Sequence, residues 1–300
     1  MRKILFVRNE KAFLPEIDAY IKYFNNTDEF VAYDSSEIGN YDINNFDIIW
    51  EMKGFGGIRS SKHIIIHDYA SLSVGSFAKS KNWIKSIINP KADLRIFLNK
   101  NVKQEFYFKN DIRYCYRDMG IDEKFIKLKS SQKEYEFVYI GAISKERNID
   151  QLLEIFTNNQ IGKLCLIGNI EDDLYKKYKY NKNFIFTGKL SYEEVPNVAS
   201  KAIYGINYIP DKYPYNLQTS TKLLEYLAMD LKVITTDYQW IKEFEQKEKI
   251  KMYKLNNLIN DLSINKIEKF DFISHKNMEK FLWNNIINES GVLKELKNIY

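Results

Sequence analysis

Short runs of β-branched and aromatic residues alternate with amphipathic segments along most of the chain, and this alternation limits the fold more than any other feature. RKILFV (2–7), FDIIWEM (46–52) and IIIHDY (64–69) have the length and composition of buried parallel strands. Between and after them, segments 13–24 and 76–88 repeat apolar residues at helical spacing. Strands that alternate with helices predict an α/β fold with doubly wound parallel sheets.

A polar, lysine-rich segment at residues 117–136 interrupts this alternation and predicts an interdomain linker. The alternation then restarts and continues to KVITTD (232–237). We therefore expect two Rossmann-like domains, at residues 1–130 and 134–275, followed by terminal helices at 276–300.

The composition is that of a chain able to bury substantial cores, with 45% hydrophobic and 28% charged residues among 300. No segment has the roughly 18 to 20 apolar residues of a membrane span, and the amino terminus becomes charged too soon for a secretory signal, so we expect a cytoplasmic protein. Cys115 and Cys165 stand far apart in apolar segments, which favours buried hydrophobic residues over a disulfide or a zinc site.

The net charge of +5 suits anionic phosphates or an anionic membrane surface. The sequence has no aromatic RNA-binding motif, no zinc finger and no concentrated arginine tract. We therefore expect no nucleic-acid partner.

The segment TSTKLLEYLAMDLKVITTD (219–237) combines a hydroxyl-rich turn, a leucine-rich helix and a strand. If Ser220 or Thr221 caps the helix, Lys222 lies in the first turn, where the positive end of the helix dipole disfavours a cation. An anion in front of this turn would remove the conflict, and the free N–H groups, the hydroxyls and Lys222 would form a phosphate site. Glu225 follows one turn later on the same side. On spacing alone, a solvated Lys–Glu pair on the surface is an equal alternative.

Four segments, in this order, resemble the carboxy-terminal domain of GT-B-type glycosyltransferases, particularly the large retaining family that uses nucleotide-diphosphate sugars (glycosyl transferases group 1, family 4-like). They are YIGAISKERNIDQLL (139–153), FTGKLSYEEVP (186–196), YIPDKYPYN (208–216) and KLLEYLAMDLKVITTD (222–237). The resemblance implies two Rossmann-like domains that face a cleft, with the first binding acceptor and the second binding donor.

The rest of the chain resembles this family more loosely. IIIHDY resembles the strand-end histidine motif of the first domain, and RDMGIDEKF (117–125) resembles the segment before the second domain. FLWNNII (281–287) resembles the closing helix that crosses back and packs on the first domain.

The resemblance implies a role for each matching residue. Glu225 matches the glutamate that contacts the ribose hydroxyls of the donor, and Arg147 matches the cation that holds the diphosphate. His67 matches the histidine that reaches across the cleft to the donor sugar, so these three are the predicted catalytic residues. The predicted donor-binding residues are Gly141, Ser144, Arg147, Gly188, Lys189, Leu190, Thr219, Ser220, Thr221, Lys222 and Glu225.

The sequence departs from the family pattern in three places. The arginine that follows the loop glycine is Ala142 here, so Lys145, Lys222 or another cation would have to supply the second positive charge. Leu217 stands where the first acid of the paired-glutamate motif would be, which leaves the sugar contacts open. Asp230-Leu231-Lys232 replaces Gly-x-Pro after the helix, and aspartate tolerates a left-handed turn.

His67 ends a predicted buried strand at the edge where loops meet the cleft, although a satisfied structural histidine is the alternative interpretation. Asp68 could orient His67, and Asp68 or Glu51 could act as the base of an inverting enzyme. GFGG (54–57) lacks the G-x-G-x-x-G spacing of dinucleotide sites and favours a flexible loop near the acceptor.

A short helix within residues 79–91 carries apolar and basic residues: Trp83, Ile84, Ile87 and Ile88 with Lys79, Lys81 and Lys85. We expect an ordinary half-buried helix with a solvated lysine face, and membrane-surface docking is the alternative. Tyr213 and Tyr215 are candidates for stacking on a sugar ring.

Together these features predict a glycosyltransferase that moves a sugar from a UDP-, GDP- or similar nucleotide sugar to a hydroxyl of a saccharide or lipid-linked acceptor. The resemblance implies retention of anomeric configuration without a metal or other cofactor, with the donor phosphate accepting the proton. We associate the activity with bacterial surface polysaccharide synthesis and with peripheral contact at the inner face of the membrane. A binding subunit of the same fold without activity, or a sugar-nucleotide epimerase, are the alternatives.

Overall fold

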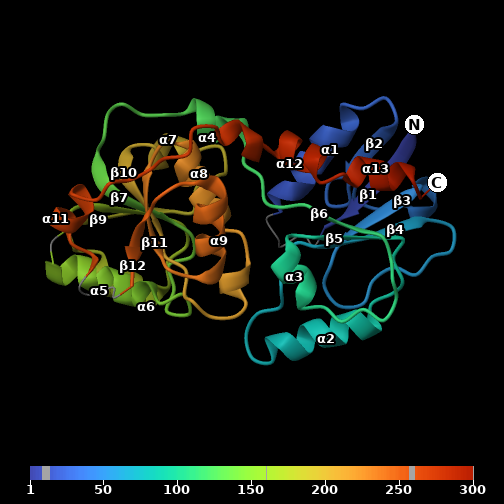
Figure 1. Cartoon of the computed structure of the whole chain (residues 1–300), viewed down its shortest axis with the longest axis horizontal. Helices are drawn as coiled ribbons and strands as arrows, with labels where there is room; N and C mark the ends of the chain where they lie inside the picture. Colours follow the sequence, from blue (N-terminus) through green and yellow to red (C-terminus); the bar gives the residue numbers. More distant parts are fainter. Residues whose placement is uncertain (9–13, 160, 257–260, 300) are drawn as a thin grey trace. The chain divides into compact units, whose positions relative to one another are not determined.

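The computed structural model describes residues 1–8, 14–159, 161–256 and 261–299. The chain divides into two compact units, each with one six-stranded parallel sheet (Figure 1). Unit 1 comprises Met1–Gly120, Leu217–Thr219 and Phe281–Tyr300, and unit 2 comprises Ile121–Asn216 and Ser220–Lys280.

The sheet of unit 1 has the strand order β2-β1-β3-β4-β5-β6, and every neighbouring pair is parallel. Its strands are β1 (Arg2–Val7), β2 (Phe30–Asp34), β3 (Ile48–Met52), β4 (Ile64–Tyr69), β5 (Leu94–Phe97) and β6 (Tyr114–Tyr116). The strand order reverses between β1 and β3, and open α/β sheets bind ligands beyond the carboxyl ends of strands at such a point.

Helices cover one face of this sheet, and on the other face Ile38, Phe46 and Ile58 pack against Leu5, Ile49 and Ile65. The helices of unit 1 are α1 (Pro15–Asn25), α2 (Ala78–Ile88), α3 (Lys100–Gln104), α12 (Trp283–Glu289) and α13 (Val292–Lys297). Helices α1, α12 and α13 lie together on one face (Figure 1), where Val292 and Leu296 share a core with Ile4 and Phe6. Phe13, where we expect the first helix to begin, lies outside the described residues.

The sheet of unit 2 has the order β12-β11-β10-β7-β8-β9, again with all pairs parallel. Its strands are β7 (Tyr135–Ile140), β8 (Leu164–Ile167), β9 (Phe184–Gly188), β10 (Ala202–Asn207), β11 (Lys232–Thr236) and β12 (Tyr253–Leu255). Here the order reverses between β7 and β10, so the carboxyl ends of these two strands mark the expected ligand position.

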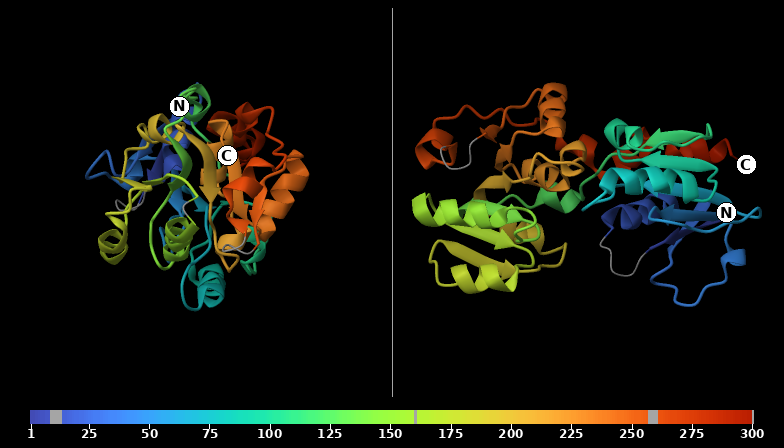
Figure 2. Two further views of the ribbon diagram at one scale, coloured as in Figure 1. Left: turned by 90° about the vertical axis from the view of Figure 1, so that its left-hand side faces the viewer. Right: turned by 90° about the horizontal axis from the view of Figure 1, so that it is seen from below.

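Helices lie on both faces of the second sheet, which confirms the predicted doubly wound class (Figure 2). They are α4 (Glu123–Lys127), α5 (Ile149–Asn159), α6 (Asp172–Tyr178), α7 (Val195–Ala199), α8 (Thr221–Ala228), α9 (Gln239–Glu248) and α11 (Ile264–Glu268). Residues of α5, α6 and α11 share one core with the sheet, whereas α7 and α8 contact β8, β10 and β11. Single 3-10 turns are η1 (Ile43–Asn45), η2 (Tyr215–Leu217) and η3 (Met278–Phe281).

The polar segment 117–136, predicted as the linker, contains a helix of its own. Asp122 caps α4 by accepting a hydrogen bond from the Lys124 N–H, and Phe125 is wholly buried with its ring centroid 5.3 Å from that of Tyr192. A five-residue helix with one buried aromatic produces no repeated apolar spacing. For this reason the sequence pattern did not indicate α4.

Candidate functional site

Helix α8 is anchored where the strand order of unit 2 reverses. Ser220 caps it: its Oγ accepts a hydrogen bond from the Leu223 N–H at 3.3 Å and donates one to Asn207 Oδ1, at the end of β10, at 2.7 Å. Six residues further along the helix, the Tyr226 hydroxyl accepts a hydrogen bond from the Ile140 N–H of β7 at 2.8 Å. The predicted cap is therefore present, and α8 is bonded to both strands that flank the reversal.

Lys222 and Glu225 form an ion pair within the first turns of α8. The Lys222 Nζ lies 2.8 Å from Glu225 Oε2; the glutamate is wholly buried, and 35% of the lysine side chain is exposed. Burial raises the pKa of Glu225, and Lys222 opposes the shift. The pair is therefore not the solvated surface pair that spacing allowed, and Glu225 is buried deeper than we expected.

Two residues that the sequence pattern did not indicate lie beside this pair. The pKa of Glu225 is raised mainly by burial, and Tyr192 and Lys124 are among the groups that oppose this rise. Lys124 Nζ lies 4.4 Å from the Tyr192 ring centroid and Lys222 Nζ lies 5.9 Å from it, so two cations flank one ring. Lys124 comes from α4 and Tyr192 from the loop after β9, and only the tertiary fold brings them to α8.

The loop after β7 makes a close backbone approach to the loop after β8. Gly141 donates its N–H to the Ile167 carbonyl at 2.9 Å. A Cβ on Gly168, which has φ 144°, would lie 2.0 Å from the Gly141 carbonyl oxygen. Glycine is therefore required at 168, where the positive φ and the close contact both exclude a side chain.

Arg147 lies exposed on this loop, next to two tyrosines. Burial raises the pKa of Tyr139 and also that of Tyr215, and Arg147 opposes both shifts. Lys145 Nζ lies 3.6 Å from Asp173 Oδ2, and both side chains are exposed, so whether Lys145 supplies the second positive charge of the loop stays a prediction. The carbonyl of Ser144 accepts the Ile149 N–H at 3.1 Å and so bonds the loop to the first residue of α5.

The remaining predicted donor residues lie on separate elements. Gly188, with φ 72°, ends β9, and its carbonyl accepts the Gly168 N–H at 2.9 Å; Lys189 is exposed and Leu190 half-buried. The Thr219 hydroxyl donates to the Asp118 carboxylate within unit 1, so it is already engaged. Thr221 is half-buried at the start of α8.

The turn after α8 also bears on the family pattern. Asp230 adopts φ 62° in place of the family's glycine, so the left-handed turn survives as expected.

His67 belongs to a polar row that crosses the sheet of unit 1. Glu51, His67 and Arg95 are direct register neighbours on β3, β4 and β5, and all three are buried. The His67 Nε2 lies 3.3 Å from Glu51 Oε2, and Glu51 also accepts from Lys53 at 3.0 Å. Burial lowers the pKa of His67, and Glu51 opposes the shift. His67 therefore lies inside β4, two residues before its end, and not at the strand end that we expected.

The loop before β4 packs tightly on this row. A Cβ on Gly57, which has φ 127°, would lie 2.0 Å from Lys53 Nζ and 2.8 Å from Glu51 Oε1. The Gly56 N–H donates to Asn89 Oδ1 at 3.0 Å, and the Ile58 N–H donates to Glu51 Oε1 at 3.2 Å. The loop predicted to be flexible is thus hydrogen-bonded at two points.

Asp68 points to the opposite face of the sheet from His67. Arg117 donates to both of its carboxylate oxygens, at 3.1 and 3.3 Å, and the Tyr20 hydroxyl donates to it at 3.2 Å. Asp68 and Arg117 are wholly buried. This is a structural ion pair, and it leaves Asp68 poorly placed to act as a base.

Helix α2 differs in part from our expectation, because Lys79 is exposed and Lys81 half-buried but Lys85 is buried. Its buried side chains are Ala78, Asn82 and Lys85, and Asn82 is wholly buried. Its exposed side chains are the apolar ones: Trp83 at 52%, Ile84 at 38%, Ile87 at 48% and Ile88 at 47%. The predicted solvated lysine face is wrong for Lys85, and α2 exposes an apolar face instead.

Among the described residues, no group of three or more His, Cys, Asp or Glu side chains could hold a metal ion. Within the same residues, no helix is both long enough and apolar enough to span a membrane. The predictions of a metal-free and cofactor-free reaction stay predictions.

The chain is similar in fold to solved structures of GT-B glycosyltransferases. The chain is similar to AviGT4, a glycosyltransferase involved in avilamycin A biosynthesis (TM-score 0.64, 9% identity, covering 100% of this chain and 98% of that one). It is similar to sucrose-phosphate synthase from Thermosynechococcus elongatus (TM-score 0.65, 12% identity, covering 99% of each chain). It is also similar to Anabaena HepE in complex with UDP-glucose (TM-score 0.63, 11% identity, covering 100% of this chain and 98% of that one). The TM-scores over nearly the full length of each chain show the GT-B fold.

The sequence itself establishes the family. The family model for glycosyl transferases group 1 matches residues 120–270, which is half of the chain. The protein therefore belongs to the glycosyl transferases group 1 family, and the resemblance seen in its motifs is confirmed. No curated protein sequence matches the chain.

Proposed function

We propose that this protein transfers a sugar from a nucleotide-diphosphate sugar to an acceptor hydroxyl, without a metal or other cofactor, and that unit 2 binds the donor. The observation that carries the proposal is the buried Glu225 held by Lys222 in the first turns of α8, at the sheet edge where open α/β folds bind ligands. Family membership supports glycosyl transfer, and the structure of HepE with UDP-glucose supports this class of donor.

In this proposal the ribose lies at Glu225 and the diphosphate lies between the first turn of α8 and Arg147. A carboxylate can accept hydrogen bonds from two vicinal hydroxyls. Because Lys222 is partly exposed, its ammonium can turn toward a phosphate once ribose hydroxyls replace it at Glu225. Lys222 and Arg147 would then neutralise the charge that develops on the leaving nucleotide.

We further propose that the reaction retains the anomeric configuration, with the leaving phosphate accepting the proton of the acceptor hydroxyl. An inverting reaction needs a carboxylate or histidine free to accept that proton. Asp68 is bonded to Arg117 and Tyr20, and Glu51 is bonded to Lys53 and lies beside His67. The engagement of both carboxylates supports retention.

The exposed apolar face of α2 supports a membrane-associated acceptor. Trp83, Ile84, Ile87 and Ile88 present this face together, and Lys79 and Lys81 lie on the same helix. A short helix with exposed apolar side chains and flanking lysines suits the boundary of an anionic bilayer. We therefore propose a lipid-linked saccharide acceptor and peripheral contact through α2, in keeping with a role in bacterial surface polysaccharide synthesis.

Titration of UDP, UDP-glucose, GDP-mannose and CMP, followed by saturation-transfer NMR and calorimetry, tests the donor site. We expect one nucleotide series to bind, and Glu225→Gln and Arg147→Gln each to weaken binding about tenfold or more. Lys145→Gln is the matched control, because it removes a cation from the same loop that is already paired with Asp173. If no nucleotide binds, or if binding ignores both substitutions, the donor site is wrongly assigned.

One observation favours a binding protein without activity. The loop after β7 has Ala142 in place of the family's arginine, which leaves one positive charge fewer beside the proposed phosphate position. A transferase should release nucleotide from its donor only when an acceptor or water reacts, and EDTA should not change that rate. Donor binding with no turnover would support the binding protein, and conversion of donor without acceptor into an epimer would support an epimerase.

A further inference from the structure

Arg95 is a buried cation, and the part of the chain that the structure describes places no acid in an ion pair with it. It is 5% exposed, and no carboxylate of the described residues lies within ion-pairing distance of its guanidinium. Its Nη2 donates to Asn110 Oδ1 at 2.7 Å and its Cζ lies 3.7 Å from the centroid of the Phe108 ring, while Nε has no hydrogen-bond partner among the same residues. A ring and neutral oxygens balance the charge only in part, and an unpaired buried charge is costly.

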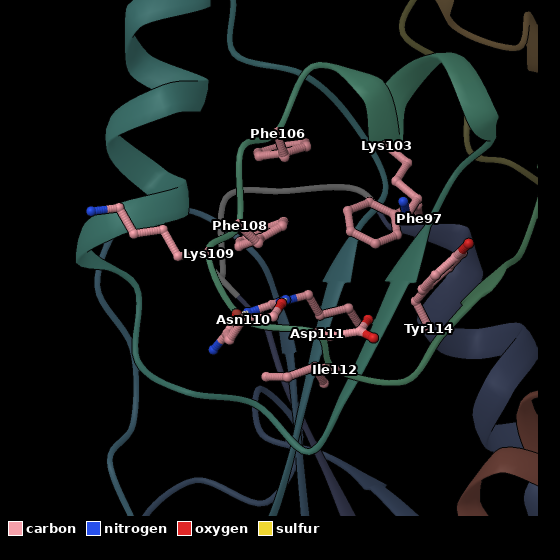
Figure 3. A pocket seen from close by; sticks show the side chains of 10 residues that line it. Phe97, Lys103, Phe106, Phe108, Lys109, Asn110, Asp111, Ile112 and Tyr114 are labelled. Carbon is pink, nitrogen blue, oxygen red and sulfur yellow. Dashed lines mark hydrogen bonds between the residues drawn. The ribbon is translucent and has the colours of Figure 1, made fainter.

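This arginine lines a pocket on the face of β5 and β6 that α1 does not cover. The pocket has a volume of about 290 Å³ and lies wholly within unit 1. Figure 3 shows Phe97, Phe106 and Phe108 along its upper part, with Asn110 and Asp111 below. Ligand pockets of proteins span roughly 300 to 1,000 Å³, so this one is at the small end of the range and suits a ligand no larger than a single substituted sugar ring.

Two further cations give the pocket a positive balance. Lys103 and Lys109 line it together with Arg95, whereas Asp111 is the acid among the lining residues. Lys103 Nζ lies 4.3 Å from the centroid of the Tyr114 ring, at one side of the pocket. Three cations against one carboxylate attract an anion, and the buried guanidinium offers it fork-shaped hydrogen bonding.

The rings give the same pocket an apolar wall. Phe106 and Phe108 are stacked, with centroids 5.7 Å apart and an interplanar angle of 14°, and Phe97 lies 6.1 Å from Phe108. Aromatic faces bind flat, partly apolar bodies such as the carbon face of a sugar ring. A simple inorganic anion would use only the cations, whereas a ring that carries an anionic group would use both features.

We propose that the pocket lined by Arg95 and Phe108 binds an anionic sugar unit of the acceptor, either a hexuronate or a sugar phosphate. The inference rests on the proposed function, because it assigns the pocket to the acceptor of the transfer. Arg95 is the register neighbour of His67, so the charged group would bind next to the polar row of unit 1.

The test uses the full chain with UDP present in excess, so that anions do not report on the donor site. Glucuronate and glucose 6-phosphate are titrated as the two anionic probes and glucose as the neutral one, with saturation-transfer NMR and calorimetry as readouts. We expect at least one anionic probe to bind about tenfold tighter than glucose. Arg95→Gln should remove this preference, and the control Arg113→Gln, which deletes an exposed cation outside the pocket, should keep it.

The inference fails if neither anionic probe binds better than glucose, or if Arg95→Gln binds them as the unchanged chain does. Should Arg95→Gln not fold, the double substitution Lys103→Gln, Lys109→Gln removes two pocket cations without touching the buried arginine and should weaken the preferred anion at least threefold. Nucleotide binding is measured separately. If the chain binds the anionic probes but not UDP, the donor site is contradicted and the pocket in unit 1 is not.

Discussion

Lys222 donates a hydrogen bond to Glu225 across one turn of α8, at 2.8 Å, although the glutamate is wholly buried and the lysine reaches solvent. A buried carboxylate with one mobile cationic partner is suited to exchange that partner for ligand hydroxyls. Lys222 and Glu225 therefore contribute both to the stability of unit 2 and to the donor binding that we propose for it.

Lys222→Met should lower the free energy of unfolding by about 1 to 3 kcal/mol, because it leaves a buried acceptor without its charged donor. Adding Glu225→Leu should cost less than the sum of the two single changes, since no unpaired charge then remains. Urea unfolding of the two single variants and the double variant measures this coupling. Lys201→Met removes one partner of the exposed pair with Glu134 and should change stability by no more than about 0.5 kcal/mol. Strict additivity at Lys222 and Glu225 would contradict the coupling.

His67 should make the protein less stable as the pH falls through about 6.5. Its pKa is lowered in the folded protein, mainly by burial, so the unfolded chain binds a proton that the folded chain does not. Stability from this source is present above about pH 6.5 and is lost below it, by up to about 1.4 kcal/mol per pH unit. The stability advantage of the unchanged chain over His67→Gln should therefore shrink between pH 7.5 and pH 5.5. If the free energies of unfolding of the unchanged chain and of His67→Gln change in parallel with pH, the prediction is wrong. His63→Gln is the control variant for the loss of a histidine elsewhere in unit 1.

Arg117→Met should destabilise unit 1 by about 3 to 5 kcal/mol, because it leaves Asp68 charged and buried without its cation. Arg113→Met, which removes an exposed arginine, is the control and should be nearly neutral.

Asp68→Asn, assayed at a temperature where it stays folded, should keep transfer activity per folded molecule within about threefold. A loss of 10² to 10⁴ in activity would instead identify Asp68 as a general base.

Replacing Trp83 and Ile87 together by serine should reduce binding to vesicles of anionic lipid by at least tenfold. Both side chains are about half exposed in α2, so the change should leave thermal unfolding nearly unaltered. Vesicle co-sedimentation measures the effect, and Tyr180→Ser, at an 84% exposed aromatic of unit 2, is the control. If the unchanged chain does not sediment with vesicles, or the double variant sediments equally, α2 is not the membrane contact.

The strands that the sequence revealed are mostly the ones paired on both sides. The runs that became β1, β3, β4 and β11 are long and β-branched, as buried parallel strands require. The strands that it did not reveal, β2, β6 and β12, are all edge strands, and β6 and β12 have only three residues each. An edge strand is covered less completely, so its sequence needs no continuous apolar run.

Local patterns also could not show which side of an element faces inward. The spacing of Trp83 and Ile87 indicated an amphipathic α2 but not that its apolar side is the exposed one. Likewise, the spacing in the α8 motif placed Lys222 and Glu225 one turn apart but left a solvated surface pair as an equal alternative, and only the resemblance favoured a site. Lys124 and Tyr192 are 68 residues apart in sequence, and nothing short of the fold brings them to one carboxylate.

The core of unit 1 is closed by Val292 and Leu296, which pack with Ile4 and Phe6 from near the other end of the sequence. During synthesis, residues 121–280 must therefore leave the ribosome before the first sheet can obtain its last helices. All strands of unit 2 lie before residue 256, so they are synthesised before the last helices of unit 1. We expect the second unit in the sequence to complete its fold first, which reverses the usual order in which domains mature on the ribosome.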